Sequence, residues 1–317
     1  MTQQFNGKIV FSSGKSGDFD IWTLDLKTEE LHQLTTGEDW NDAPRWSPDG
    51  RSIAFVSNRS GVPELWLMNE VGGEQRQLTS SGKYHGTPTW SPDGKYLACC
   101  ANYEDADEIE LWKIRADGEG QPELLHASPG LETGPSWSPD GRKIVFSSEP
   151  QETGARDLFE LNLESQKTTQ LTSHKARDYA PSYSPDGSLI AFVSNRAEKG
   201  GVKNDSDVWL VSSDGMSEPR RVTKNKGPDL FVSWAPSGEW LIYCAAPSNS
   251  NAGRIHMIDL VESKVIKVSI DRTELDSELE AEIKSYGLLP KLIPNFLQRK
   301  FASSRYFGAE RFPHWKA

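Results

Sequence analysis

Short runs of apolar residues, separated by turn residues, cover most of this chain. The stretch between Thr87 and Leu125 contains four of them, at 87–91, 95–100, 110–114 and 123–125. Pro92-Asp-Gly94 separates the first two runs and supplies a glycine that can adopt a positive φ. Runs of this length between turn signals predict β-strands, and their short spacing predicts an antiparallel meander of four strands.

The same pattern returns along the chain with a period in the forties. It is marked by five copies of one phrase, Trp46-Ser-Pro-Asp-Gly50, Trp90-Ser-Pro-Asp-Gly94, Trp137-Ser-Pro-Asp-Gly141, Tyr183-Ser-Pro-Asp-Gly187 and the degenerate Trp234-Ala-Pro-Ser-Gly238. Second strands are expected around Ile9, Ile53, Leu97, Ile144, Ile190 and Leu241. Self-similarity at this period indicates repeated supersecondary units, and the six second strands predict six of them.

The sixth first strand is found near the end of the chain. Arg311-Phe-Pro-His-Trp-Lys316 matches Asp42-Ala-Pro-Arg-Trp-Ser47, so residues 313–316 are expected to be the innermost strand of a unit whose other three strands lie in residues 7–35. Sharing one unit between both chain ends closes a ring and removes exposed sheet edges. The sequence therefore predicts an all-β fold, a single six-bladed β-propeller over residues 1–317 closed by a shared blade.

Several phrases resemble a known repeat family. They are Trp-Ser-Pro-Asp-Gly, Ile53-Ala-Phe-Val-Ser-Asn-Arg59 with its copy at 190–196, Asp20-Ile-Trp22, and the Gln-Leu-Thr triplets at 33–35, 77–79 and 170–172. Together they resemble the WD40-like PD40 repeat, which builds the propeller of the Tol translocation protein TolB and those of prolyl-oligopeptidase-type peptidases. The resemblance covers nearly all of residues 7–269 and implies a propeller. No peptidase activity is expected, because the repeats leave no room for a hydrolase domain.

Composition narrows the classes of partner and compartment. A formal net charge of −11 argues against nucleic-acid binding, which requires clustered Lys and Arg. The three cysteines are expected to be free and buried, because Cys100 and Cys244 occupy equivalent positions in blades across the ring. No stretch has the length of a membrane span and no signal-peptide core is present, so we expect a cytoplasmic protein. A periplasmic or secreted protein would look the same after removal of its leader.

One position differs in residue type from blade to blade, five residues before each first-strand aromatic. It is occupied by Asn41, His85, Glu132, Asp178, Asp229 and Glu310. Connections to innermost strands arrive at the channel mouth, so we expect these six residues, which we call the acidic ring, to surround one opening. An oxygen-rich ring suits Ca²⁺ or another divalent cation, or an ammonium or guanidinium group of a partner. The alternative is a set of solvated acids too far apart to share a metal ion.

A long insert precedes the last strand, over residues 270–310. Its first part, 271–287, begins with capping residues, contains helix-favouring residues and ends in Gly287, which predicts a helix. An apolar series from Leu288 to Phe301 follows. Because the insert leaves and re-enters on the face of the acidic ring, it is expected to form a lid over the channel mouth. An exposed docking surface for a partner is the alternative.

Two classes of function remain open. The sequence shows no convergent nucleophile and base and no Gly-x-Ser-x-Gly elbow. This favours a non-enzymatic scaffold that binds a protein, a peptide or a small ligand. The alternative is a metal-assisted carbohydrate-active lyase or hydrolase that uses the channel mouth; the resemblance to oligogalacturonate lyases suggests a histidine-rich metal site for it. The six histidines occupy different registers, so such a site is not expected. No catalytic residue or certain cofactor is predicted.

Overall fold

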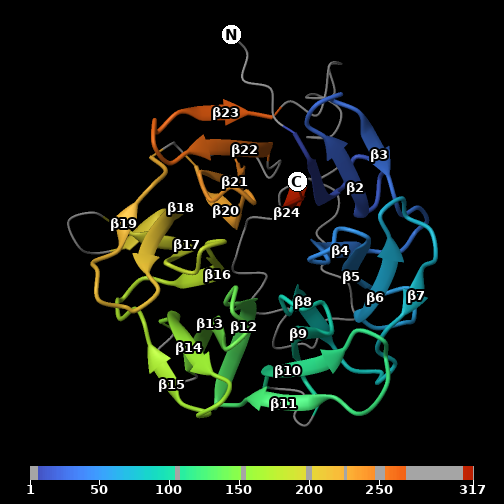
Figure 1. The fold of residues 1–317 in the computed structure, drawn as a ribbon, viewed down its shortest axis with the longest axis horizontal. Helices are drawn as coiled ribbons and strands as arrows, with labels where there is room; N and C mark the ends of the chain where they lie inside the picture. The colour runs from blue at the N-terminus through green and yellow to red at the C-terminus, as the bar shows by residue number, and fades with distance from the viewer. Residues whose placement is uncertain are drawn as a thin grey trace.

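The computed structural model describes residues 6–103, 108–150, 155–197, 202–224, 227–246, 254–268 and 310–316. The predicted all-β, six-bladed propeller is confirmed: six four-stranded antiparallel sheets surround a central axis (Figure 1). The described residues contain no helix, and therefore no helix among them could span a membrane. The predicted helical insert, residues 270–310, lies outside the described residues except for Glu310.

Each sheet is one blade, and its strands run in order from the innermost to the outermost. The first blade joins both ends of the chain: β24 (Glu310–Lys316), β1 (Lys8–Ser13), β2 (Asp20–Asp25) and β3 (Leu31–Gln33). The second contains β4 (Asn41–Trp46), β5 (Ser52–Ser57), β6 (Glu64–Asn69) and β7 (Arg76–Gln77). The third contains β8 (His85–Trp90), β9 (Tyr96–Ala101), β10 (Glu110–Arg115) and β11 (Glu123–His126).

The remaining three blades follow the same order. The fourth contains β12 (Gly130–Trp137), β13 (Lys143–Pro150), β14 (Asp157–Asn162) and β15 (Thr168–Gln170). The fifth contains β16 (Asp178–Tyr183), β17 (Leu189–Arg196), β18 (Val202–Ser212) and β19 (Arg220–Arg221). The sixth contains β20 (Asp229–Trp234), β21 (Trp240–Ala245), β22 (Arg254–Asp259) and β23 (Val265–Lys267).

The repeated Ser-Pro-Asp-Gly phrase forms the turn between the two inner strands of a blade. In the second blade, Ser47 Oγ donates to Asp49 Oδ1 at 2.6 Å and accepts from the amide of Ser52 at 2.9 Å. Gly50 has a φ of 68°, which a glycine adopts without a steric penalty. The hydrogen bond from Ser47, followed by that from the Arg51 amide, lowers the pKa of Asp49. The phrase is therefore a local hydrogen-bonded turn, which explains its near-exact repetition.

The core lies mainly between neighbouring blades. Phe11, Phe55, Phe146, Phe192 and Tyr243 are completely buried on the second strands. One cluster joins Val10 and Ile21 of the first blade to Ile53 and Phe55 of the second. Two first-strand tryptophans also bond across blades: Trp90 Nε1 donates to the carbonyl of Arg45 at 3.1 Å and Trp234 Nε1 to that of Ser182 at 2.9 Å. These aromatic residues therefore help to pack blade against blade.

Every innermost strand is interrupted by a β-bulge. The register shifts between Asp42 and Arg45 in β4, and at the equivalent place in β8, β12, β16, β20 and β24. In five of these strands the bulge residue has a positive φ: Ala43, Thr87, Gly134, Ala180 and Phe231. Bulges redirect side chains and are common beside binding sites. In this propeller they determine which residues of the innermost strands face the axis.

Candidate functional site: the central cavity

A cavity of about 660 Å³ lies at the centre of the propeller. Innermost strands β4, β8, β12, β16 and β20 all contribute to its wall, and His314 of β24 completes it. The bulge residue of each of these five strands lines the cavity: Ala43, Thr87, Gly134, Ala180 and Phe231. These residues share a structural place but differ in size, so each of the five blades contributes a different side chain to the collar that they form.

Aromatic side chains form much of the cavity wall. They are Trp40, Tyr84, Trp137, Tyr179, Tyr183, Phe231 and Trp234. Burial raises the pKa of Tyr84 and Tyr179 above the usual value, so both phenols are protonated at neutral pH. Tyr179 Oη donates to Ser206 Oγ at 3.0 Å, which fixes its ring at the wall. Rigid aromatic groups with polar tips are suited to holding a ligand that has both apolar and polar parts.

Two arginines share one carboxylate at the wall of the cavity. Glu149 Oε2 accepts from Arg156 Nη2 and from Arg177 Nη2, each at 2.7 Å, and from Arg156 Nε at 3.1 Å. Glu149 is nearly completely buried, whereas both arginines line the cavity. One carboxylate balances only one of the two positive charges. The cluster is therefore a positively charged surface whose guanidinium groups are held in place by Glu149.

A second polar group lies near β24. Asp42 accepts a short hydrogen bond from Ser12 Oγ and one from the amide of Ala43 at 2.8 Å. Burial lowers the pKa of Arg45 to about 10, while nearby Asp42 partly offsets this effect. Burial, together with Arg45, lowers the pKa of His314 to about 3, and its Nδ1 accepts from the amide of Trp46 at 3.0 Å. His314 is therefore neutral, and the charged residues lining the described cavity are three arginines and Asp42.

The five described side chains of the acidic ring do not line this cavity. Asn41, His85, Glu132, Asp178 and Asp229 lie in the innermost strands of five blades and are completely buried. Their chain neighbours line the cavity instead: Trp40 and Asp42, Tyr84 and Gly86, Leu131 and Thr133, Arg177 and Tyr179, and Leu230. The side chains of a strand alternate between two faces, so these five residues point away from the face that lines the cavity. The side chain of Glu310 is outside the described part.

Two of these ring residues, Asn41 and His85, bind side chains of the preceding blade, whereas Asp178 binds side chains of its own blade. Asn41 Nδ2 donates to Asp20 Oδ1 of the preceding blade at 3.3 Å, and its Oδ1 accepts from Arg59 Nη2 at 2.8 Å. Asp178 accepts from Ser194 Oγ at 2.6 Å and pairs closely with the guanidinium of Arg196. Asn41 thus connects two neighbouring blades, and both Asn41 and Asp178 are completely buried.

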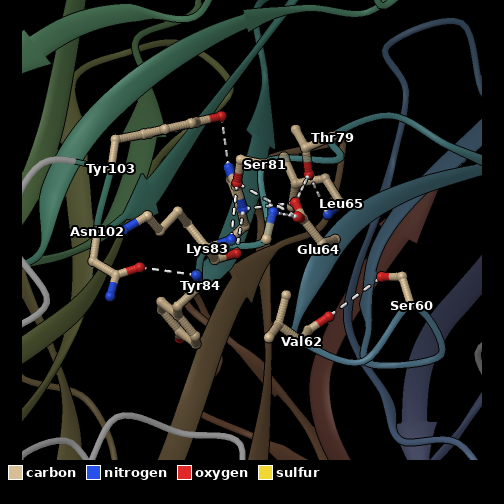
Figure 2. A network of polar contacts seen from close by, with 12 residues as sticks. Ser60, Val62, Glu64, Leu65, Thr79, Ser81, Lys83, Tyr84, Asn102 and Tyr103 are labelled. Carbon is tan, nitrogen blue, oxygen red and sulfur yellow. Dashed lines mark hydrogen bonds and ion pairs between the residues drawn. The ribbon is translucent and has the colours of Figure 1, made fainter.

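His85 forms the most extended of these connections, and Figure 2 labels its partners Glu64, Lys83 and Tyr103. Its Nδ1 lies 2.9 Å from Glu64 Oε2 of the preceding blade and 3.0 Å from the carbonyl of Lys83. Both of these atoms are acceptors, so Nδ1 carries the proton, and Nε2 accepts from Tyr103 Oη at 2.8 Å. Although burial alone would raise the pKa of Glu64, it is lowered, because His85, Thr79 and the amide of Gly82 stabilise the carboxylate.

Glu132 is less completely hydrogen-bonded than Asn41, His85 and Asp178. Its Oε1 accepts from Ser148 Oγ at 3.3 Å and, through a short contact, from Ser128 Oγ, while its buried Oε2 has no hydrogen-bond partner among the described residues. Burial raises the pKa of Glu132 to about 7, against the effect of both serines and Arg156. This carboxyl group is therefore partly protonated near neutral pH.

The cation hypothesis for the ring stays a prediction. Within the described part of the chain, no three His, Cys, Asp or Glu side chains are grouped so that they could hold a metal ion.

The arginine cluster was not predicted from the sequence, although the sequence contained a signal for it. Asn58, Asn102 and Asn195 recur after the second strands, where their Oδ1 atoms accept the amides of Trp40, Tyr84 and Arg177 at 2.8 Å. The fourth blade has Glu149 at this position.

The fold and the cavity define a six-bladed propeller with a ligand-sized central chamber. The family profile described as PD40, TolB beta propeller domain, matches residues 6–152 and 119–203, more than half of the chain. The chain therefore belongs to the TolB β-propeller family. No curated protein sequence matches it.

Similar solved structures support the same fold. TolB from Acinetobacter baumannii is 19% identical with a TM-score of 0.73, over 99% of this chain and 67% of that one. Oligogalacturonate lyase from Vibrio parahaemolyticus is 19% identical with a TM-score of 0.58, over 86% of this chain and 79% of that one. A puromycin-hydrolysing peptidase from Mycobacterium tuberculosis is 14% identical with a TM-score of 0.60, over 86% of this chain and 45% of that one. At these identities the similarity concerns the fold alone.

Proposed function

We propose that this protein is a non-enzymatic, TolB-like interaction scaffold that binds a protein or peptide segment in its central cavity. The observation that carries the proposal is the cavity of about 660 Å³, with its aromatic wall and its collar of bulge residues. Aromatic and arginine side chains dominate the binding energy of protein interfaces. Fixing them on closed sheets reduces the entropy lost on binding.

The arginine cluster indicates what the bound segment carries. Arg156 and Arg177 each use part of their donor set on Glu149, and the remaining N–H groups are available to a carboxylate of the ligand. A bound carboxylate would balance the second positive charge. The preferred segment is therefore apolar or aromatic with an acidic side chain or a free C-terminus.

A peptide-display selection on the purified protein tests this function. Peptides that enrich on the wild type are measured for binding to Phe231→Ala and Arg177→Gln, with circular dichroism as the test of folding. Each variant should weaken binding by about 2 kcal/mol or more, roughly 30-fold, because both side chains occupy the proposed site. The matched control is Met216→Ala, which changes an exposed residue outside the cavity lining. Peptides that bind all variants equally, or no enriched peptides, would contradict the proposal.

A further inference from the structure

The sixth blade departs from the repeat at two facing positions. On the second strand the other blades have Phe11, Phe55, Cys99, Phe146 and Phe192, whereas the sixth has Tyr243. On the third strand they have Trp22, Trp66, Trp112, Phe159 and Trp209, whereas the sixth has His256. The strand registers pair these residues blade by blade, and Tyr243 pairs with His256. A polar pair thus replaces the largely apolar pair of the repeat.

A cavity of about 610 Å³ opens at this pair. Its lining comes from β19 of the fifth blade and from β21, β22 and β23 of the sixth, strands that are labelled in Figure 1. Histidine is smaller than the tryptophan that occupies this position in four blades, so the substitution leaves space between the blades. Tyr243 is completely buried, and its ring lies edge-on to that of His256 with centroids 5.6 Å apart. The cavity is separate from the central one.

Both polar side chains of the pair lack partners. Neither Tyr243 Oη nor His256 Nδ1 has a hydrogen-bond partner among the described residues, although both atoms are buried. Buried polar atoms in folded proteins are nearly always paired, so these two require a partner that occupies the cavity. Burial raises the pKa of Tyr243, with a contribution from Asp229, and therefore keeps the phenol as a donor. Burial, followed by Lys267 and Arg254, lowers the pKa of His256 and favours the neutral imidazole.

The charge of the wall identifies the kind of partner. Its basic residues are Arg220, Arg221, Lys224 and Lys267. Arg221 Nη2 donates to Asp207 at 2.8 Å. Among the described residues of the lining the one carboxylate is that of Asp259, which accepts the amides of Val261 and Glu262 at 2.7 and 2.9 Å and so holds its own turn. In a chain of net charge −11, this local excess of positive charge attracts anions.

From this arrangement we infer that the cavity between the fifth and sixth blades binds a small oxyanion, a phosphate or a carboxylate. Tyr243 Oη donates to the anion at the floor of the cavity, and His256 Nδ1 lies beside it. Arg220 and Lys267 supply positive charge at the wall. A tyrosine hydroxyl, an imidazole and basic groups together match the acceptor oxygens of such an anion.

The probes are inorganic phosphate and acetate, each titrated at constant ionic strength while thermal unfolding is followed. At a hundred times its dissociation constant, a bound anion should raise the Tm by about 4 °C in a chain of 317 residues. A shift with phosphate alone, or with acetate alone, identifies the source of the anion and supports the site. No shift with either probe at tens of millimolar would overturn it.

Variants that restore the repeat locate the binding. Tyr243→Phe removes only the donor and should weaken binding at least tenfold, whereas His256→Trp fills the space and should abolish it. Both variants should fold, because the fifth blade has phenylalanine and tryptophan at these two positions, where Phe192 pairs with Trp209. The indole N–H of Trp209 also has no hydrogen-bond partner among the described residues. Lys267→Gln removes one positive charge from the cavity wall and leaves Tyr243 and His256 unchanged. Lys95→Gln, at an exposed position, is its matched control. Unchanged binding in Tyr243→Phe and Lys267→Gln would refute the inference.

Discussion

Replacing Thr79 by valine tests whether the ring residues connect neighbouring blades. Thr79 Oγ1 donates to Glu64 Oε2 at 2.5 Å and accepts from the amide of Leu65 at 2.9 Å, and both bonds are buried (Figure 2). Valine keeps the shape of threonine and removes the hydroxyl. The substitution therefore leaves the Leu65 amide without this acceptor and the Glu64 carboxylate without one of its donors.

The expected loss follows from these two bonds. A buried amide left unsatisfied costs about 1–3 kcal/mol, and a hydrogen bond to a charged group contributes about 1.5–3 kcal/mol. Because Glu64 keeps its contacts with His85 and the Gly82 amide, we expect roughly 2–4 kcal/mol in total. An unfolding entropy of about 2.1 cal/mol/K per residue, over 317 residues, converts this loss to a fall in Tm of about 3–6 °C.

Differential scanning calorimetry of the variant and the wild type at pH 7 measures this effect. Thr169→Val is the matched control, since the same change on the exposed edge strand β15 should alter stability by less than about 0.5 kcal/mol. A Thr79→Val protein as stable as the Thr169→Val control would refute the view that the Glu64–His85 network holds the blades together.

Three further outcomes are expected. Glu132 has a pKa raised to about 7 in the folded protein, so the free energy of unfolding should fall by up to about 3 kcal/mol between pH 4.5 and pH 8. Urea unfolding at a series of pH values measures this fall. Glu132→Gln should remove it, whereas Glu164→Gln, at an exposed position, should retain it. Burial raises the pKa of the Cys99 and Cys100 thiols. A thiol reagent should therefore modify the folded protein far more slowly than the urea-unfolded protein. Fast reaction of the folded protein would contradict the buried positions of these cysteines. If the acidic ring binds a cation, Ca²⁺ should raise the Tm relative to chelator, and Asp178→Asn with Asp229→Asn should remove the increase; equal Tm values would exclude such a site.

The sequence alone determined the architecture of this protein. Each blade is specified by local signals, a Ser-Pro-Asp-Gly turn flanked by two apolar strands, and the period of these signals counts the blades. The match of Arg311–Lys316 to the other first strands predicted which segment pairs with β1, because both segments carry the same repeat.

Tertiary structure decided which residues face a ligand. Bulges in the innermost strands turn Asp42, Thr87 and Phe231 toward the axis, while Asn41 and His85 are buried away from the cavity. Moving by one residue along a strand reverses the face on which a side chain lies. Glu149, Arg156 and Arg177 meet only because β13 and two connections converge beside the axis. The cavity at Tyr243 and His256 likewise requires β19 of another blade as its wall. These features depend on contacts between distant segments, which no local pattern of residues specifies.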